Sequence, residues 1–189
     1  MAEPIGETMD NLVVRAKTDP AALGQLYERH YAPVLRYCIH RLFIRDVAED
    51  ATSEVFLKAA RGIREFRGQT EKDFANWLYA IATSEANSTI RKRCNRQELL
   101  AAAISQRRIH LVESVEDCHD EPDWATLYES IASLPRLDQS VVVLRSFEQL
   151  PFEQIASICN MKTVAARVAF SRALAKLRKR LTKAIGRGR

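Results

Sequence analysis

Apolar residues recur at intervals of three and four through most of the first ninety positions, which is the period of an amphipathic α-helix. The pattern predicts a first helix that starts at Pro20 with Asp19 as its N-cap. We expect Pro33 to bend or interrupt this helix, because proline removes a backbone N–H donor. A second helix is predicted from about Asp46 to Arg61.

A loop is predicted over residues 62–69, followed by a third helix from about Thr70 to Arg96. The buried stripe of this third helix consists of Phe74, Trp77, Leu78 and Ile81. Trp77 is therefore assigned to the core. The three helices are expected to pack into one compact unit.

The apolar period resumes at Trp124, after a stretch without a sustained repeat. One amphipathic helix is predicted around Leu127 and Ile131, and another begins at Leu134–Pro135 and carries Leu137. From Leu150 onward the pattern is that of a helix-turn-helix. Its expected features are Pro151 in the first turn of a short helix, Asn160 at a left-handed turn, Thr163 as the next N-cap, and a buried face of Ala166, Phe170, Leu174, Leu177 and Leu181.

Composition supports an all-α fold with two small helical domains. The 189 residues include only 6 Gly and 6 Pro, too few for the frequent tight turns of a many-stranded sandwich or barrel. The predicted division is an N-terminal tail (1–18), a first domain (19–97), an acidic linker (98–123) and a second domain (124–185). No apolar run approaches the roughly 18 residues of a membrane span, and the N-terminus lacks signal-peptide features, so a cytoplasmic protein is expected.

Charge is segregated along the chain, although the formal net charge is only +5. Residues 109–135 contain seven acids and neither Lys nor Arg, whereas residues 160–189 contain ten bases and no acid. A second basic cluster consists of Arg91, Lys92, Arg93 and Arg96. Two separated basic clusters suggest two contacts with a polyanion. The alternative is that these bases only compensate helix dipoles and keep the protein in solution.

Residues that could perform catalysis are not arranged in any recognised pattern. The four cysteines show no CxxC spacing, the four histidines form no triad or metal motif, and there is no glycine-rich phosphate loop. Cys118 and His119, with His110 nearby, are weak candidates for a metal or redox site. We therefore expect neither an enzyme nor a bound cofactor.

The predicted helix-turn-helix gives a specific binding hypothesis. Its second helix would place N-terminal residues against base edges in a DNA major groove and basic residues against phosphates. The alternative is a plain antiparallel helical hairpin with a solvated basic face. The turn residue Asn160, the small Ala156 at the helix crossing and the charge asymmetry together favour DNA binding.

Two groups of segments between Leu23 and Leu181 carry a resemblance to a known family. The first group is LYERHYAPVLRYC, AEDATSEVFLKA, FANWLYAIA and RKRCNR, and the second is SLPRLDQSVVVLRSFEQLPFEQIA and SRALAKLR. In order and spacing they resemble regions 2 and 4 of the extracytoplasmic-function sigma factors, the two-domain class of bacterial transcription initiation subunits. The resemblance implies a non-catalytic subunit that binds core RNA polymerase and promoter DNA and is controlled by an anti-sigma factor.

The resemblance also implies roles for particular residues. Those implied to bind core polymerase are Asp46, Glu49, Asp50, Glu54, Phe56 and Leu57. Those implied to contact the melted −10 element are Arg64, Phe66, Arg67, Ser84, Asn87, Ser88, Arg91, Lys92 and Arg93. Those implied to contact the double-stranded −35 element are Lys162, Thr163, Ala165, Arg167, Val168, Arg172 and Lys176.

The sequence departs from the family pattern at both promoter-facing helices. Ser84 and Ser88 stand where many members have Asn and Asp, so a −10 preference does not transfer. Ala165 and Ala169 replace residues that supply a hydroxyl and a positive charge, which places more of the expected −35 contact on Lys162 and Arg172. A competing hypothesis is a helix-turn-helix regulator that acts without polymerase, but it leaves the first-half resemblance unexplained.

Overall fold

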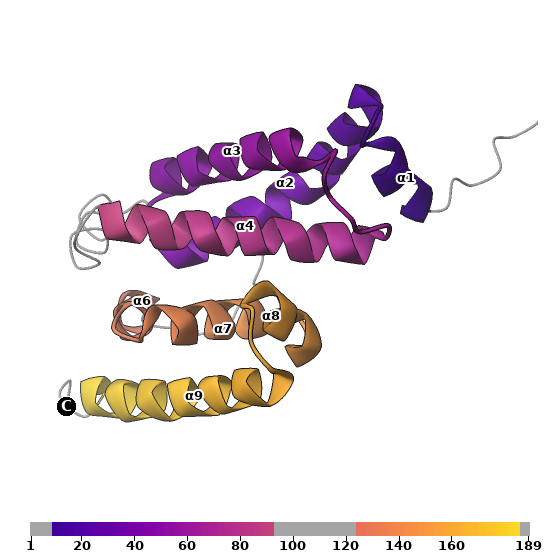
Figure 1. Cartoon of the computed structure of the whole chain (residues 1–189). Helices are drawn as coiled ribbons and strands as arrows, with labels where there is room; N and C mark the ends of the chain where they lie inside the picture. The colour runs from indigo at the N-terminus through magenta and orange to yellow at the C-terminus, as the bar shows by residue number, and fades with distance from the viewer. Residues whose placement is uncertain (1–8, 93–123, 186–189) are drawn as a thin grey trace, which may run out of the picture.

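The computed structural model describes residues 9–92 and 124–185, and these residues form helices and connecting turns without a strand (Figure 1). The first unit contains α1 (Met9–Arg15), α2 (Pro20–Leu42), α3 (Arg45–Gly62) and α4 (Glu71–Lys92). The second unit contains α6 (Trp124–Ala132), α7 (Arg136–Ser146), α8 (Phe152–Ile158) and α9 (Thr163–Ile185). The predicted all-α, two-unit architecture is confirmed.

Helix α2 begins as its sequence predicts but does not stop at Pro33. The Asp19 carboxylate accepts a hydrogen bond from the Ala21 N–H at 2.9 Å, and Pro20 occupies the first helical position. The expected interruption at Pro33 is wrong, because α2 remains one assigned helix from Pro20 to Leu42. Buried residues on both sides of Pro33, including Leu26 and Tyr37, pack against α3 and α4 and compensate for the missing backbone donor.

The start of α4 is fixed by a reciprocal capping box. The Thr70 hydroxyl accepts from the Asp73 N–H at 3.1 Å, and the Asp73 carboxylate accepts from the Thr70 N–H at 3.2 Å. These hydrogen bonds lower the pKa of Asp73. Phe74 and Leu78 are buried as predicted, whereas Trp77 and Ile81 are half-buried at the edge of the same core. The predicted continuation to Arg96 lies outside the described residues.

The helix-turn-helix is present, with corrections at its helix ends. Asn160 adopts the expected left-handed conformation with φ 49°, and the Met161 N–H donates to the Ala156 carbonyl at 2.9 Å. Pro151 precedes α8 as its N-cap and does not enter its first turn. The Lys162 carbonyl accepts the first helical hydrogen bond of α9, from the Ala166 N–H, so Lys162 occupies the N-cap position assigned to Thr163.

The buried face of α9 differs from the expected one. It consists of Ala166, Ala169, Ala173 and Leu177, whereas Leu174 is exposed and Phe170 and Leu181 are half-buried. Small residues on this face allow α9 to lie close to α7 and α8. Leu137, which the pattern placed on an apolar side of α7, is also exposed. Alanines therefore occupy most of the inward face of α9, with Leu177 as the one large apolar side chain among the buried residues that the structure describes there.

The two units pack against each other through α2 and α4 on one side and α7 and α8 on the other (Figure 1). The Glu148 carboxylate, only 1% exposed, accepts hydrogen bonds from Arg36 at 3.2 and 2.7 Å and from the Tyr79 hydroxyl at 3.1 Å. Burial and the Glu148 charge raise the pKa of Tyr79. A bidentate, charge-assisted contact thus joins the units at the end of α7.

A second polar contact joins the units at Arg41, which is fully buried. Its guanidinium donates to Gln139 Oε1 at 2.6 Å and to Asn87 Oδ1 at 2.9 Å. Gln139 in turn donates from Nε2 to the carbonyls of Ala132 and Leu134, at 2.8 and 3.0 Å. Arg41 therefore links α2, α4 and α7 through side-chain hydrogen bonds. We call the Arg36–Glu148–Tyr79 and Arg41–Gln139–Asn87 contacts the polar seam.

The polar seam predicts that removing its buried acid, Glu148, lowers stability more than removing an exposed acid elsewhere. Replacing Glu148 by Ala leaves the buried Tyr79 and the half-buried Arg36 without their shared acceptor, and we expect a loss of about 1–3 kcal/mol in unfolding free energy, measured by urea denaturation. The matched control is Glu49→Ala, which removes the exposed Arg45–Glu49 pair on α3 and should cost about 0.5 kcal/mol or less. Equal losses in the two variants would contradict a structural role for the polar seam.

His40 gives the packing between the units a pH dependence. Its ring stacks on Phe147 with centroids 4.1 Å apart, and its Nδ1 lies 3.2 Å from the Tyr128 hydroxyl. Burial, reinforced by the nearby Arg36 charge, lowers the pKa of His40 to about 4. Because the unfolded chain keeps a histidine pKa near 6.5, it binds more protons than the folded chain between these values.

Stability contributed by neutral His40 should therefore fall as the pH falls through this window. We expect wild type to lose about 2 kcal/mol more than His40→Gln between pH 7 and pH 5, measured as unfolding free energy at each pH. The comparison with the variant removes the contributions of other titrating groups. Parallel pH profiles for the two proteins would show that His40 is not held neutral by its surroundings.

Candidate nucleic-acid interface

The N-terminal half of α9 stands exposed at the surface of the second unit. Lys162, Val164, Ala165, Arg167 and Val168 are exposed, and Thr163 is half-buried. The Arg167 guanidinium lies 5.6 Å from the Phe152 ring centroid and 3.3 Å from a Glu153 carboxylate oxygen. Both members of this ion pair are mostly exposed, so the pair holds Arg167 only weakly and leaves it available to a phosphate.

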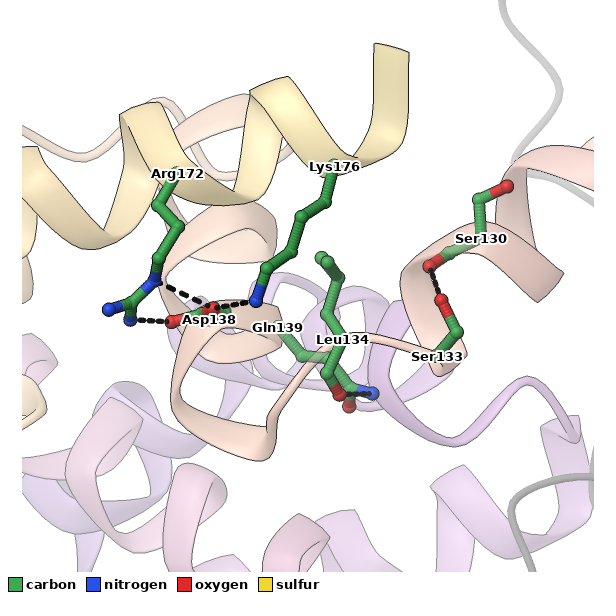
Figure 2. Close-up of polar contacts among 7 residues, drawn as sticks. All are labelled: Ser130, Ser133, Leu134, Asp138, Gln139, Arg172 and Lys176. Atoms are coloured by element: carbon green, nitrogen blue, oxygen red, sulfur yellow. Dashed lines mark hydrogen bonds and ion pairs between the residues drawn. The ribbon is translucent and has the colours of Figure 1, made fainter. Parts of the chain in front are cut away.

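Arg172 and Lys176 occupy a different environment, because both pair with one buried carboxylate (Figure 2). Arg172 Nη2 lies 2.6 Å and Lys176 Nζ lies 3.6 Å from the carboxylate oxygens of Asp138. The Asp138 side chain is 1% exposed and belongs to the first turn of α7. These two cations therefore fix α9 against α7. Sequence reasoning, which assigned both to DNA, did not detect this internal partner.

The loop before α4 presents two exposed cations beside an aromatic stack. Arg64 and Arg67 are exposed, whereas Phe66 is half-buried and stacks on Trp77 with centroids 4.7 Å apart. A Cβ atom at Gly68 would lie 2.2 Å from the Phe66 ring, so this close approach requires glycine. Phe66 thus joins the aromatic edge of the core in this structure.

The candidate −10 residues on α4 lie in distinct environments. Ser84, Arg91 and Lys92 are exposed, and Ser88 is half-buried. Asn87 accepts a hydrogen bond from Arg41 and therefore forms part of the polar seam. Arg93 lies outside the described residues.

Helix α3 presents an acidic surface with one apolar side chain. Asp46, Asp50 and Glu54 are exposed, Glu49 pairs with Arg45 at 2.8 Å, and Leu57 is 42% exposed. Phe56, which the resemblance placed on the polymerase-binding surface, is instead buried. Its ring centroid lies 4.8 Å from that of Tyr27 and 6.0 Å from that of Tyr31. Tyr27, itself exposed, lies beside this surface and was missed; its spacing of four from Tyr31 was the available signal.

Other candidate chemistry finds little support in the described part of the chain. Within residues 9–92 and 124–185, no three His, Cys, Asp or Glu side chains gather as metal ligands. His110, Cys118 and His119 lie outside those ranges. Burial raises the pKa of both Cys38 and Cys159 to about 11, which keeps these thiols protonated at neutral pH. None of the described helices combines the length and apolar character of a membrane span.

Comparison with known protein families assigns both units. The family model for Sigma-70 region 2 matches residues 26–96, and the model for Sigma-70 region 4 matches residues 125–177. The first match covers α2 from Leu26 onward together with α3 and α4, and the second covers α6 from its second residue, α7, α8 and α9 as far as Leu177.

Curated relatives agree with these family matches. The chain is 27% identical to RNA polymerase sigma factor YlaC of Bacillus subtilis, over 86% of this chain and 93% of the relative. It is 30% identical to RNA polymerase sigma-H factor of Pseudomonas aeruginosa, over 79% of this chain and 82% of the relative. It is 28% identical to ECF RNA polymerase sigma factor SigE of Mycolicibacterium smegmatis, over 96% of this chain and 71% of the relative.

Solved structures support the fold. CnrH, determined in complex with the cytosolic domain of CnrY, aligns with a TM-score of 0.69 at 19% identity, over 94% of this chain and 99% of that one. Sigma factor RpoE of Bartonella quintana, determined with the anti-sigma factor NepR, aligns with a TM-score of 0.61 at 20% identity, over 84% and 96%. With two matching region models in the expected order and a 30% identical relative, the chain belongs to the extracytoplasmic-function family of RNA polymerase sigma factors.

Proposed function

We propose that this chain binds core RNA polymerase in the cytoplasm and directs it to promoters, without catalysing a reaction itself. The observation that carries this proposal is the exposed N-terminal half of α9, the second helix of a helix-turn-helix, in a chain whose first unit is a sigma region 2. A helix presented in this way fits a major groove. A regulator acting without polymerase would use α6 to α9 but leave residues 26–96 without a role.

The polymerase contact is proposed for the exposed acidic surface of α3. Asp46, Asp50 and Glu54 supply negative charge, and Leu57 supplies an apolar contact at the edge of the same helix. Charged groups on a rim steer association, whereas a neighbouring apolar side chain contributes burial once the partners meet. Phe56 supports this surface from behind through Tyr27 and Tyr31.

The two promoter contacts are proposed for different units. Arg64, Arg67, Arg91 and Lys92 are exposed cations suited to phosphates around a melted −10 element. Lys162 and Arg167 are suited to phosphates of a double-stranded −35 element. Control by an anti-sigma factor is proposed by analogy with RpoE of Bartonella quintana, whose structure includes NepR.

The proposed polymerase contact is tested by Asp50→Asn combined with Leu57→Ala. Both side chains are exposed, so we expect unchanged thermal stability but about tenfold weaker binding to core polymerase, measured by fluorescence titration. The matched control combines Glu129→Gln with Leu137→Ala on the second unit, which changes the same charge and a leucine of nearly equal exposure (43% against 42%). Equal weakening by both double variants would argue against α3 as the contact surface.

The different environments of Arg167 and Arg172 predict that replacing the first by alanine weakens DNA binding, whereas replacing the second lowers stability. Arg167→Ala should leave unfolding free energy unchanged but reduce holoenzyme affinity for promoter DNA severalfold, with the slope of log K against log salt reduced by about one. Arg172→Ala should lower the unfolding free energy, because buried Asp138 loses its closest partner. An unchanged salt slope for Arg167→Ala, measured between 50 and about 200 mM salt, would exclude a phosphate contact there.

A further inference from the structure

Two valines on the exposed half of α9 have no role in the fold. Val164 is 71% exposed and Val168 is 57% exposed. At 100° per residue they lie 40° apart on the helix, while buried Ala169 and Ala173 lie about 140° and 180° from Val164. Neither valine therefore packs against the other helices of the second unit. β-Branched residues also lower helix propensity slightly, so helix formation does not explain them either.

The surroundings of these valines favour a nucleic-acid partner. Lys162 precedes the pair and Arg167 lies between them in the sequence, and α9 carries no acidic residue. Glu153 forms an ion pair with Arg167, but both side chains are mostly exposed, so this pair can exchange for a phosphate. An apolar pair flanked by cations matches a surface that is apolar at its centre and negatively charged at its edges.

A thymine in a DNA major groove offers that combination. Its C5 methyl is the apolar group on the major-groove edge of an A·T pair, and side chains that contact it are themselves apolar. The N-terminal residues of the second helix of a helix-turn-helix are the ones that approach base edges. Val164 and Val168 lie in the first two turns of α9, within the part of the helix that makes such contacts.

We propose that Val164 and Val168 contact thymine C5 methyl groups in the −35 element and make this sigma factor specific for thymine at one or two positions. The inference rests on the proposed function, because it requires α9 to bind that element. Arg167 would add affinity for any sequence through a phosphate, whereas the two valines would discriminate between bases. Burial of one methyl group corresponds to an affinity change of about fourfold.

The test uses holoenzyme assembled from core polymerase and the full chain. A library of promoter duplexes randomised around −35 is first selected by holoenzyme binding, and the enriched duplex is then synthesised with deoxyuridine in place of each thymidine. Deoxyuridine keeps every hydrogen-bonding group and removes only the methyl. For wild type we expect about fourfold weaker binding at one or two positions. Val164→Ala and Val168→Ala should each bind the thymidine and deoxyuridine duplexes equally at one such position.

Leu174→Ala is the matched control, because Leu174 is also an exposed apolar residue of α9 but lies beyond the first two turns. It should retain the wild-type preference for thymidine. The inference is overturned if wild type binds the two duplexes equally, or if both valine variants keep the wild-type preference. Failure to enrich any −35 sequence would instead overturn the proposed −35 contact of α9, and this outcome is distinct because no methyl comparison is then reached.

Discussion

The position of the DNA-facing helix depends on one buried carboxylate. Asp138 lies in the first turn of α7 and attracts Arg172 and Lys176 from the middle of α9. With alanines on most of the buried face of α9, close packing alone leaves few interlocking side chains to define its rotation. The paired cations supply that definition, because rotation of α9 would leave a buried charge without its partners. The contacts of Asp138 with one side of α9 therefore determine the direction in which the opposite, exposed face points, with Arg167 at its centre.

The contact between the two units combines the polar seam with ring packing of His40 on Phe147 and Phe43 on Tyr128. The hydrogen-bonded charges of the polar seam, such as Arg36 and Glu148, exchange their contacts for water when the units separate, whereas apolar side chains lose theirs. The net stability of such a contact is modest, although removal of a single partner is costly. Placing Asn87 and Tyr79 of α4 in the polar seam also means that the same helix faces both the second unit and the proposed −10 element.

Much of the fold could be predicted from the sequence because it is encoded locally. The start of α2 follows from Asp19 and Pro20, and the left-handed turn follows from Asn160. Burial around α9 could not be predicted in the same way, since Ala173 is buried beside the exposed Leu174 that the apolar pattern assigned to the core. The internal partner of Arg172 was also hidden, because Asp138 is 34 residues distant in the sequence and resembles an ordinary acid in a first helical turn. Local signals thus defined the helices, while long-range pairing decided which candidate residues are available to a ligand.

The layered order of the helices limits how far apart on DNA α4 and α9 can bind at the same time. Helices α7 and α8 lie between α4 and α9 (Figure 1), and packed helices are about 8–10 Å apart, so the axes of α4 and α9 are separated by about 20 Å. The −10 and −35 positions are separated by about 25 base pairs, or about 85 Å along a straight duplex at 3.4 Å per step. If α4 and α9 bind these two elements as proposed, no straight promoter can engage both while the units remain packed. The two units must then separate before both elements are bound, which exposes the hydrogen-bonding groups of Glu148 and Arg41 to water.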